Sequence, residues 1–173
     1  MFILLLFGLI FFIGGLYNFY FYHDNIEAWG GLLISSLLFS LFFFIRHEKN
    51  KSLEFLNWLF RNKTLLDQGT LLYNGERITK NSEVVQFEAV LSFLVFSTKI
   101  SSRFYLKTPH NLFIVGLAYS FITLLFGLWA IPHGPIWTIK SIMTNLRGGK
   151  RQKILDLLGL KIKKINQAGA SLP

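Results

Sequence analysis

The side chains that most often carry out enzyme chemistry are few in this sequence and lie far apart. The chain of 173 residues has no Cys, which excludes disulfides, thiolate metal sites, iron–sulfur clusters and Cys nucleophiles. Its four His residues lack the spacing of a metal site on one helix face, and none has a carboxylate in a ligand pattern. Phosphate-binding glycine loops, nucleophile elbows and paired catalytic acids do not occur. We therefore expect no enzyme, no metal site and no cofactor.

Glu88 is the acidic residue with the best claim to a function. It lies inside the apolar stretch 84–98, VVQFEAVLSFLVFST. A carboxylate within a membrane costs roughly 2.5–3.5 kcal/mol at mid-depth and usually serves as a proton relay or an ion ligand. Glu88 is therefore a candidate intramembrane polar site. The alternative is that it ends a span at the headgroups or faces a soluble domain.

Composition indicates that much of the chain has lipid as its solvent. Apolar residues make up 52 % and charged residues 16 %, against about 25 % charged in typical soluble proteins. The mean hydropathy is +0.45 and Phe alone occurs 19 times. A soluble domain of this size does not have such a composition.

Two apolar segments at the N-terminus predict a transmembrane hairpin. Residues 2–22 hold no charged side chain and match the roughly 20 residues that cross a bilayer as a helix. The segment has no basic start and ends in an aromatic run, which favours a retained anchor over a cleaved signal peptide. Residues 28–45 form the second span, after a turn of five residues.

The later spans are predicted less directly. No charged side chain occurs between Thr108 and Ile139, and residues 111–131 read as a span that ends before Pro132 and Pro135. Residues 136–146 are too short to cross, so we expect an interfacial helix there. We also expect 84–105 to cross, which gives four crossings. The alternative is that the last span turns back at Pro132 to Pro135 as a re-entrant hairpin.

A competing interpretation places strands in the middle of the chain. Asn74-Gly75 stands between apolar residues over 71–78, a pattern typical of a tight β-hairpin. The Val and Phe content of 84–98 also suits a buried strand. A small strand-containing segment between the second and the last span is therefore the alternative to a third crossing.

Small residues along the spans predict where helices pack. They allow close approach in lipid, where packing replaces the hydrophobic drive. The helix-packing candidates share one face of the last span or of the second span, and they are Gly116, Ser120, Thr123, Gly127, Gly31 and Ser35.

The net charge of +9 is concentrated in the second half of the chain. Up to Glu88 there are 7 Lys and Arg against 8 Asp and Glu; after it there are 11 against 1. We expect a basic amphipathic tail over 150–167 and an amphipathic helix over 52–62 at the membrane surface. The tail residues expected to contact anionic headgroups, or equally a partner protein, are Lys150, Arg151, Lys153, Lys161, Lys163 and Lys164.

These patterns predict an all-α multi-pass membrane protein with four transmembrane helices, the third of them marginal. The expected parts are a hairpin over 1–45, a mixed cytoplasmic segment over 46–83, further helices over 84–146 and a basic tail over 147–173. Basic flanks mark the cytoplasmic side, so both termini are expected in the cytoplasm, at a plasma membrane such as the bacterial inner membrane.

The function expected from the sequence is that of a non-catalytic membrane subunit. It would act as a scaffold, sensor or anchor that assembles with itself or with a cytoplasmic partner at the inner leaflet. A channel or transporter subunit is the alternative, with Glu88 and the polar stripe of the last span lining a pore. Anionic lipid is the expected ligand of the basic surfaces, and nucleic acid is not expected, because no aromatic–basic stacking platform is visible.

Overall fold

The computed structural model describes residues 2–22, 25–93, 96–106, 112–130 and 133–159. Of the residues that it describes, 67 % are helical and 19 % form strands, which are arranged in three small antiparallel sheets. It divides into two compact units, Met1–Glu48 and Lys49–Pro173, which are described separately here.

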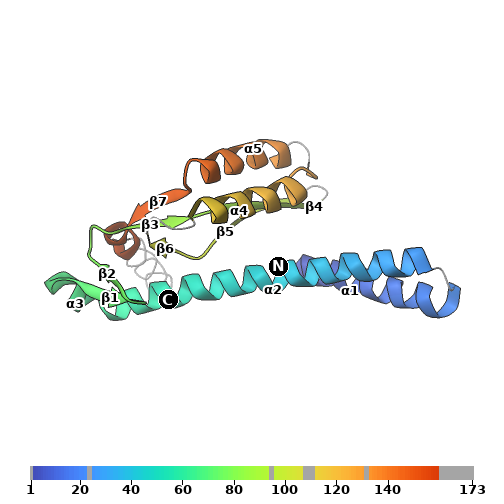
Figure 1. Ribbon diagram of the computed structural model, residues 1–173, viewed down its shortest axis with the longest axis horizontal. Helices are drawn as coiled ribbons and strands as arrows, with labels where there is room; N and C mark the ends of the chain where they lie inside the picture. The colour runs from blue at the N-terminus through green and yellow to red at the C-terminus, as the bar shows by residue number, and fades with distance from the viewer. Residues whose placement is uncertain (1, 23–24, 94–95, 107–111, 131–132, 160–173) are drawn as a thin grey trace, which may run out of the picture. The chain divides into compact units, whose positions relative to one another are not determined.

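The first unit is a helical hairpin (Figure 1). It consists of α1 (Phe2–Tyr17), a π-helical turn η1 (Asn18–Tyr22) and the first part of α2 (Asn25–Arg61). Glycines allow the two helices to approach closely: a Cβ placed on Gly31 would lie 3.0 Å from the Cα of Gly15. At the turn, Asn18 Nδ2 donates a hydrogen bond to Glu27 at 3.3 Å. The hairpin expected from the sequence is therefore held by backbone contact through small residues.

The second unit starts with the end of α2 and a β-hairpin. After α3 (Lys63–Gln68), strands β1 (Leu71–Tyr73) and β2 (Glu76–Ile78) pair antiparallel around Asn74 and Gly75. Both turn residues have positive φ, 51° and 84°, as a two-residue hairpin turn requires. The Asn-Gly pair thus forms the turn that its sequence indicates.

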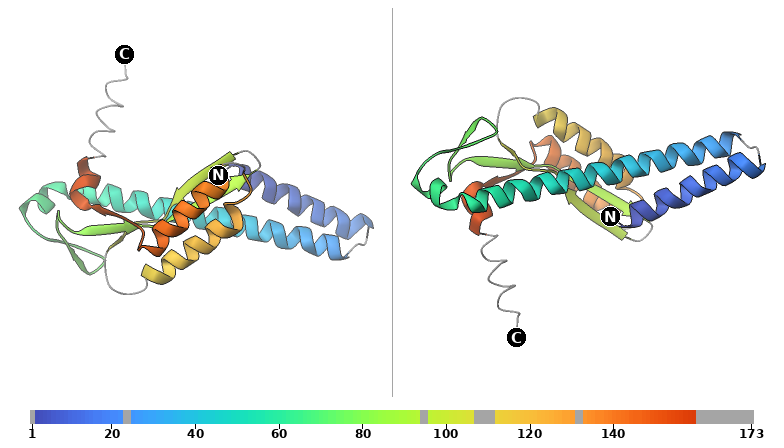
Figure 2. Two further views of the ribbon diagram at one scale, coloured as in Figure 1. Left: turned by 90° about the horizontal axis from the view of Figure 1, so that it is seen from above. Right: turned by 90° about the horizontal axis from the view of Figure 1, so that it is seen from below.

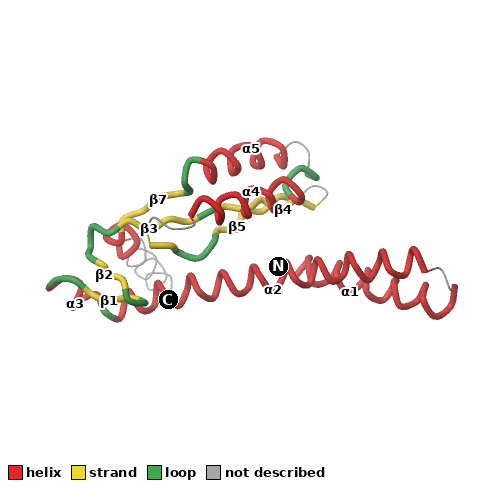
Figure 3. The backbone as a smooth tube through the Cα atoms, viewed as in Figure 1, coloured by secondary structure: helices red, strands yellow, loops and turns green. Residues whose placement is uncertain are grey.

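Two further sheets follow (Figure 3). Strand β3 (Glu83–Gln86) lies between β6 (Tyr105–Leu106) and β7 (Lys150–Lys153), antiparallel to both. Strand β4 (Glu88–Phe93) pairs with β5 (Phe96–Ser101), with Glu88 opposite Ser101.

Two helices cover the sheet formed by β4 and β5 (Figure 2). Helix α4 (Leu112–Phe126) and helix α5 (His133–Leu146) contact each other, and both contact β4. Pro135 stands in the first turn of α5, where its missing N–H leaves no helical hydrogen bond unmade. Helices α4 and α5 therefore lie side by side, which the contacts between them show.

The core of the second unit lies under the end of α2. Phe55 and Leu59 from α2 are 2 % and 1 % exposed and pack with Ile78, Val84 and Ile154. The helix predicted over 52–62 is thus present as the last part of α2. Its apolar face contributes to a protein core.

The prediction of an all-α fold with four crossings is wrong. The segment 84–105, expected as the third crossing, forms strands β3, β4, β5 and part of β6. Helix α4, expected as the fourth, has 15 residues, fewer than the roughly 20 that a crossing needs. Among the described residues, two helices are long and apolar enough to span a membrane, Phe2–Phe21 and Ile26–Arg61.

The prediction of an amphipathic helix over 150–167 is wrong in its first part. Lys150, Arg151 and Lys153 stand on strand β7, and helix occupies 154–159. Strand β7 pairs with β3 over four residues, from Glu83 opposite Lys153 to Gln86 opposite Lys150. The other candidate residues, Lys161, Lys163 and Lys164, lie outside the described residues.

Candidate functional site

Strand β4 is held along one edge by side chains in place of a further strand. Asn145 of α5 bonds the backbone of Glu88 twice: Oδ1 accepts from the Glu88 N–H at 2.9 Å and Nδ2 donates to its carbonyl at 2.8 Å. Thr123 Oγ1 accepts from the Val90 N–H at 3.3 Å. Ser92 Oγ donates to the Gly127 carbonyl at 2.8 Å. Asn145 of α5 and Thr123 of α4 thus bond the backbone along the edge of β4, and Ser92 of the strand bonds the segment that follows α4.

The small residues predicted as helix-packing candidates on the last span lie where α4 contacts α5 and β4. Gly116, Ser120 and Thr123 are buried on α4, and Gly127 follows the helix. A Cβ on Gly116 would lie 2.9 Å from the carbonyl oxygen of Asn145, and one on Gly127 would collide with Thr138 Oγ1. The stripe therefore packs against α5 and β4.

The two candidates on the second span lie in the first unit. Gly31 contacts α1 through the backbone of Gly15 and Phe11. Ser35 is 2 % exposed, and its hydroxyl donates to the Leu32 carbonyl at 2.8 Å.

Glu88 lies on β4 beside a cation. Its carboxylate is 3.6 Å from Lys99 Nζ on the paired strand β5, and the two side chains are 19 % and 33 % exposed. Lys99 also lies over the ring of Trp137, 5.6 Å from its centroid. Glu88 and the polar stripe, suggested above as pore-lining groups, are thus engaged in the packing around β4.

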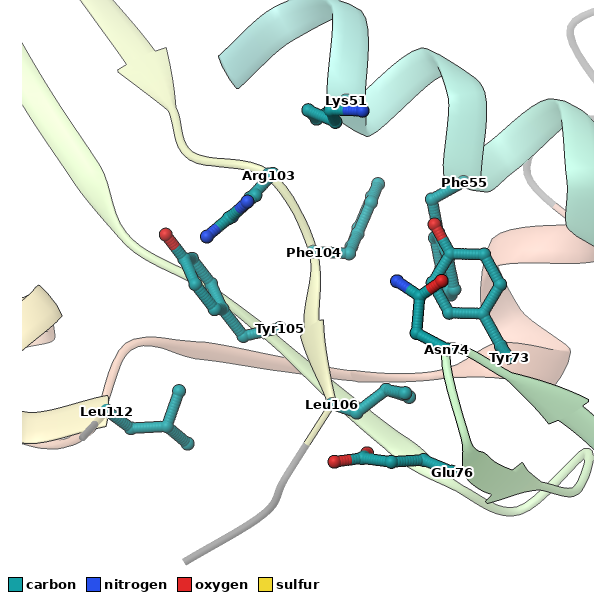
Figure 4. A pocket seen from close by; sticks show the side chains of 10 residues that line it. All are labelled: Lys51, Phe55, Tyr73, Asn74, Glu76, Arg103, Phe104, Tyr105, Leu106 and Leu112. Atoms are coloured by element: carbon teal, nitrogen blue, oxygen red, sulfur yellow. The ribbon is translucent and has the colours of Figure 1, made fainter. Parts of the chain in front are cut away.

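A pocket of about 280 Å³ opens elsewhere in the second unit (Figure 4). Its walls come from the end of α2, the β1–β2 hairpin, the segment 103–106 and the start of α4. Aromatic rings form much of the lining: Phe55 lies 5.0 Å from Tyr73 and 5.4 Å from Phe104, centroid to centroid. Such rings offer a flat apolar surface to a ligand.

Charged groups of both signs surround these rings. Arg103 stacks on Tyr105, with 5.0 Å from its Cζ to the ring centroid. Lys51 also lines the pocket, and its Nζ is paired with Glu54 at 2.9 Å. In Figure 4, Lys51 and Arg103 lie on one side of Phe104 and Glu76 lies on the other. The arrangement can hold a small amphiphilic group but contains no nucleophile–base pair.

Neither this pocket nor the role of Asn145 was predicted from the sequence. The pocket-lining residues come from four separate segments, and Asn145 is 57 residues from Glu88. The aromatic and basic residues over 103–106 were the only local signal for the pocket.

The His and acidic residues are not gathered into a metal site within the described part of the chain. His47 lies on α2, and His133 begins α5 with its ring 6.2 Å from that of Trp137. His23 and His110 lie outside the described residues.

No protein-family model, curated protein or solved structure matches this chain. Functional inference therefore depends on the physical properties of the two units.

Proposed function

We propose that this protein is a membrane-anchored, non-catalytic module. In this proposal the first unit holds the chain in the bilayer, and the second unit recruits a cytoplasmic partner of acidic character. The protein acts by assembly, as a scaffold or anchor at the inner leaflet.

The outward apolar surface of the α1–α2 hairpin is the observation that carries the proposal. Of the most apolar windows of the two helices, 17 % and 33 % of residues are buried. Side chains such as Ile13, Leu33 and Phe43 are 60 %, 69 % and 64 % exposed. A soluble protein rarely exposes a contiguous apolar surface of this kind, whereas lipid-facing helices require one.

The change along α2 supports an anchor that ends within the helix. Residues 28–45 hold no charged side chain, and at 1.5 Å per residue these 18 residues extend about 27 Å, close to the hydrocarbon thickness. From Arg46 onward the same helix carries charged residues, and from Phe55 it belongs to a protein core.

The charge of the second unit supports recruitment of an acidic partner. Asp156 is the only acid in the sequence after Glu88, against 11 Lys and Arg. Lys150, Arg151 and Lys153 are exposed on β7, which lies at one edge of its sheet. Surface charge of one sign increases the rate of association with a partner of opposite charge.

Extraction of membranes with alkaline carbonate tests the anchor. We expect the full chain to stay in the pellet. Release of the chain into the supernatant would overturn the anchor.

Purification of the full chain in mild detergent, with identification of co-purifying proteins, tests recruitment. A partner that is retained by the parent chain should be lost from a variant with Lys150→Gln, Arg151→Gln and Lys153→Gln. The matched control removes three positive charges elsewhere in the same unit, with Arg61→Gln, Lys63→Gln and Arg77→Gln, and should retain the partner. Equal loss from both variants would show that β7 has no specific role.

A further inference from the structure

The helices α4 and α5 bury small and polar residues and expose most of their large apolar residues, although Lys140 of α5 is also exposed on the outer face. The buried residues of α4 are Gly116, Tyr119, Ser120 and Thr123. Those of α5 are Gly134, Thr138, Ser141 and Asn145. On a surface helix of a water-soluble protein the apolar stripe faces the core, so both helices show the reverse of that pattern.

The outer face of α4 is broad and carries no hydrogen-bonding side chain within the helix. Its large exposed side chains are Phe113, Ile114, Leu117, Phe121, Leu124 and Leu125, from 43 % to 66 % exposed. With 3.6 residues per turn they occupy an arc of about 120°. Leu128 and Trp129, just beyond the helix, continue this surface at 45 % and 71 % exposure.

Helix α5 extends the same surface. Ile136, Ile139, Met143 and Leu146 are exposed along its outer side, and Ile136 and Ile139 are 62 % and 60 % exposed. In contrast, the neighbouring strand β5 exposes the polar residues Thr98, Lys99 and Ser101 and one large apolar side chain, Phe96. The large exposed apolar side chains are therefore concentrated on α4 and α5, and few occur on β5.

We propose that the outer faces of α4 and α5 lie among the acyl chains of one membrane leaflet, without crossing it. The two helices form a pair that enters and leaves the membrane on the same side. This inference rests on the proposed function, because it presumes that the chain is at a membrane. It adds a second membrane contact to the anchor, made by the unit that recruits the partner.

Backbone hydrogen bonding supports lipid as the occupant. Non-helical backbone is tolerated at membrane depth only where protein covers it and its polar groups are paired. Val90, Leu91 and Ser92 of β4 are 0 %, 2 % and 3 % exposed, and Thr123 of α4 and Asn145 of α5 supply side-chain hydrogen bonds to the backbone along the strand edge. Strand β4 is thus equipped for an environment without water.

The composition of the outer faces also favours lipid over a protein partner. Protein interfaces combine an apolar centre with polar groups and a polar rim. The exposed arc of α4 offers Phe, Ile, Leu and Ala side chains alone. Arg147 follows α5 directly and is exposed, where it can meet anionic headgroups.

Spin labels on single cysteines test this inference in the full chain, which has no native Cys. Labels are placed through Leu117→Cys, Phe121→Cys and Ile139→Cys, all at exposed positions. The chain is reconstituted in vesicles of phosphatidylethanolamine and phosphatidylglycerol. Collision with molecular oxygen reports exposure to lipid, and collision with a water-soluble nickel chelate reports exposure to water.

Two reference labels separate this inference from the anchor. Leu37→Cys lies on the proposed span, where the side chain is 52 % exposed, and Leu72→Cys lies on β1, where it is 66 % exposed. A lipid signal at Leu37 supports the anchor, whatever the labels on α4 and α5 report. Leu72 should report water.

We expect an oxygen-to-nickel collision ratio several-fold higher at positions 117, 121 and 139 than at position 72. A high nickel signal at these three positions, with a lipid signal at 37, would overturn the inference and leave the anchor standing. Low collision with both reagents would also overturn it, because it would show that protein, either the α1–α2 hairpin or a second copy, covers the face. Water at both 37 and 121 would overturn both proposals.

Discussion

The carboxamide of Asn145 binds both backbone polar groups of Glu88, at 2.9 Å and 2.8 Å, and so occupies the place of a neighbouring strand. Asn145 is 2 % exposed, so water has little access to replace these bonds. The contact joins the last turn of α5 to the first residue of β4. It fixes the helix against the strand at the point where β4 begins.

Asn145→Ala should therefore destabilise the second unit. It leaves the part-buried Glu88 N–H without its partner and the Glu88 carbonyl with only a longer contact, 3.4 Å from Thr123 Oγ1, which costs about 1–3 kcal/mol in the free energy of unfolding. Thermal unfolding of the full chain in detergent, followed by tryptophan fluorescence, measures the loss. Thr144→Ala is the control, since the Thr144 hydroxyl only donates to the Lys140 carbonyl within its own helix. Equal melting temperatures for the two variants would contradict the role of Asn145.

Glu88→Gln should leave the free energy of unfolding nearly unchanged, although Asn145 is hydrogen-bonded to the backbone of this residue. Asn145 contacts the backbone of Glu88, and the substitution alters only the side chain. The ion pair with Lys99 is 3.6 Å long and partly exposed, so its loss should cost less than about 1 kcal/mol. A loss as large as that of Asn145→Ala would show that the carboxylate, and not the backbone contact, matters most. Thermal unfolding of the full chain in detergent measures both losses and so distinguishes the carboxylate from the backbone contact.

Removal of an unpaired buried hydroxyl from α5 should stabilise the protein, whereas removal of the hydrogen-bonded Ser92 hydroxyl should destabilise it. Thr138 Oγ1 and Ser141 Oγ have no hydrogen-bond partner among the described residues and are 1 % and 0 % exposed as residues. Ser141→Ala removes an unpaired buried polar group and should raise the free energy of unfolding by up to about 1 kcal/mol. Ser92→Ala removes a bond to the Gly127 carbonyl and should lower it by about 1–2 kcal/mol. Destabilisation by Ser141→Ala would indicate a hydrogen bond to water or to another part of the chain.

The glycines of the α1–α2 hairpin should separate into two classes. A Cβ on Gly31 meets Gly15 Cα at 3.0 Å and the Phe11 carbonyl at 3.1 Å, both backbone atoms that cannot move aside cheaply. Gly31→Ala should therefore destabilise the hairpin by about 1–3 kcal/mol. Gly30→Ala, one residue away and with nothing within 4 Å, should stabilise the helix by up to about 1 kcal/mol. Loss of helical circular dichroism during denaturation in mixed micelles measures both, and equal effects would contradict the close approach.

The strand β4 shows why the middle of the chain was misread as a crossing. Ala89, Val90 and Leu91 are consecutive and all buried, so this part of the strand has no alternation of apolar and polar residues. A strand covered on both faces appears in sequence as a continuous apolar run, which periodicity cannot distinguish from a buried helix. Basic residues over 46–80 and over 140–164 then favoured a third crossing, because both regions can be cytoplasmic only if an even number of crossings separates them. Helix α4 is shorter than a crossing requires and contacts α5, so no compensating crossing is needed.

The small-residue stripe was predictable, and its partner was not. Spacing alone placed Gly116, Ser120 and Thr123 on one face, and that face is buried. What it contacts depends on a strand about 30 residues earlier and on Asn145, for which no local pattern exists. The Asn-Gly turn, in contrast, is specified by two adjacent residues, Asn74 and Gly75, with the backbone angles that such a turn requires.

Asp67 should titrate below its usual range because of Lys80. The pKa of Asp67 is lowered mainly by the hydrogen bond from the Lys80 ammonium, 2.8 Å away, with smaller electrostatic contributions from Lys80 and Lys63; desolvation opposes them. A depressed folded-state pKa means that the pair stabilises the fold above the unfolded-state pKa. That stabilisation is lost as the pH falls through the folded-state pKa.

Two lysine variants test the order of these causes. Lys80→Gln removes the direct ammonium bond and should raise the pKa of Asp67 clearly. Lys63→Gln removes only a more distant charge and should raise it less. The carboxyl carbon shift of Asp67, followed by NMR between neutral and strongly acidic pH, gives both values. Because each variant removes one positive charge, a larger effect of Lys63→Gln would show that the ion pair between Asp67 and Lys80 is not what holds the carboxylate ionised.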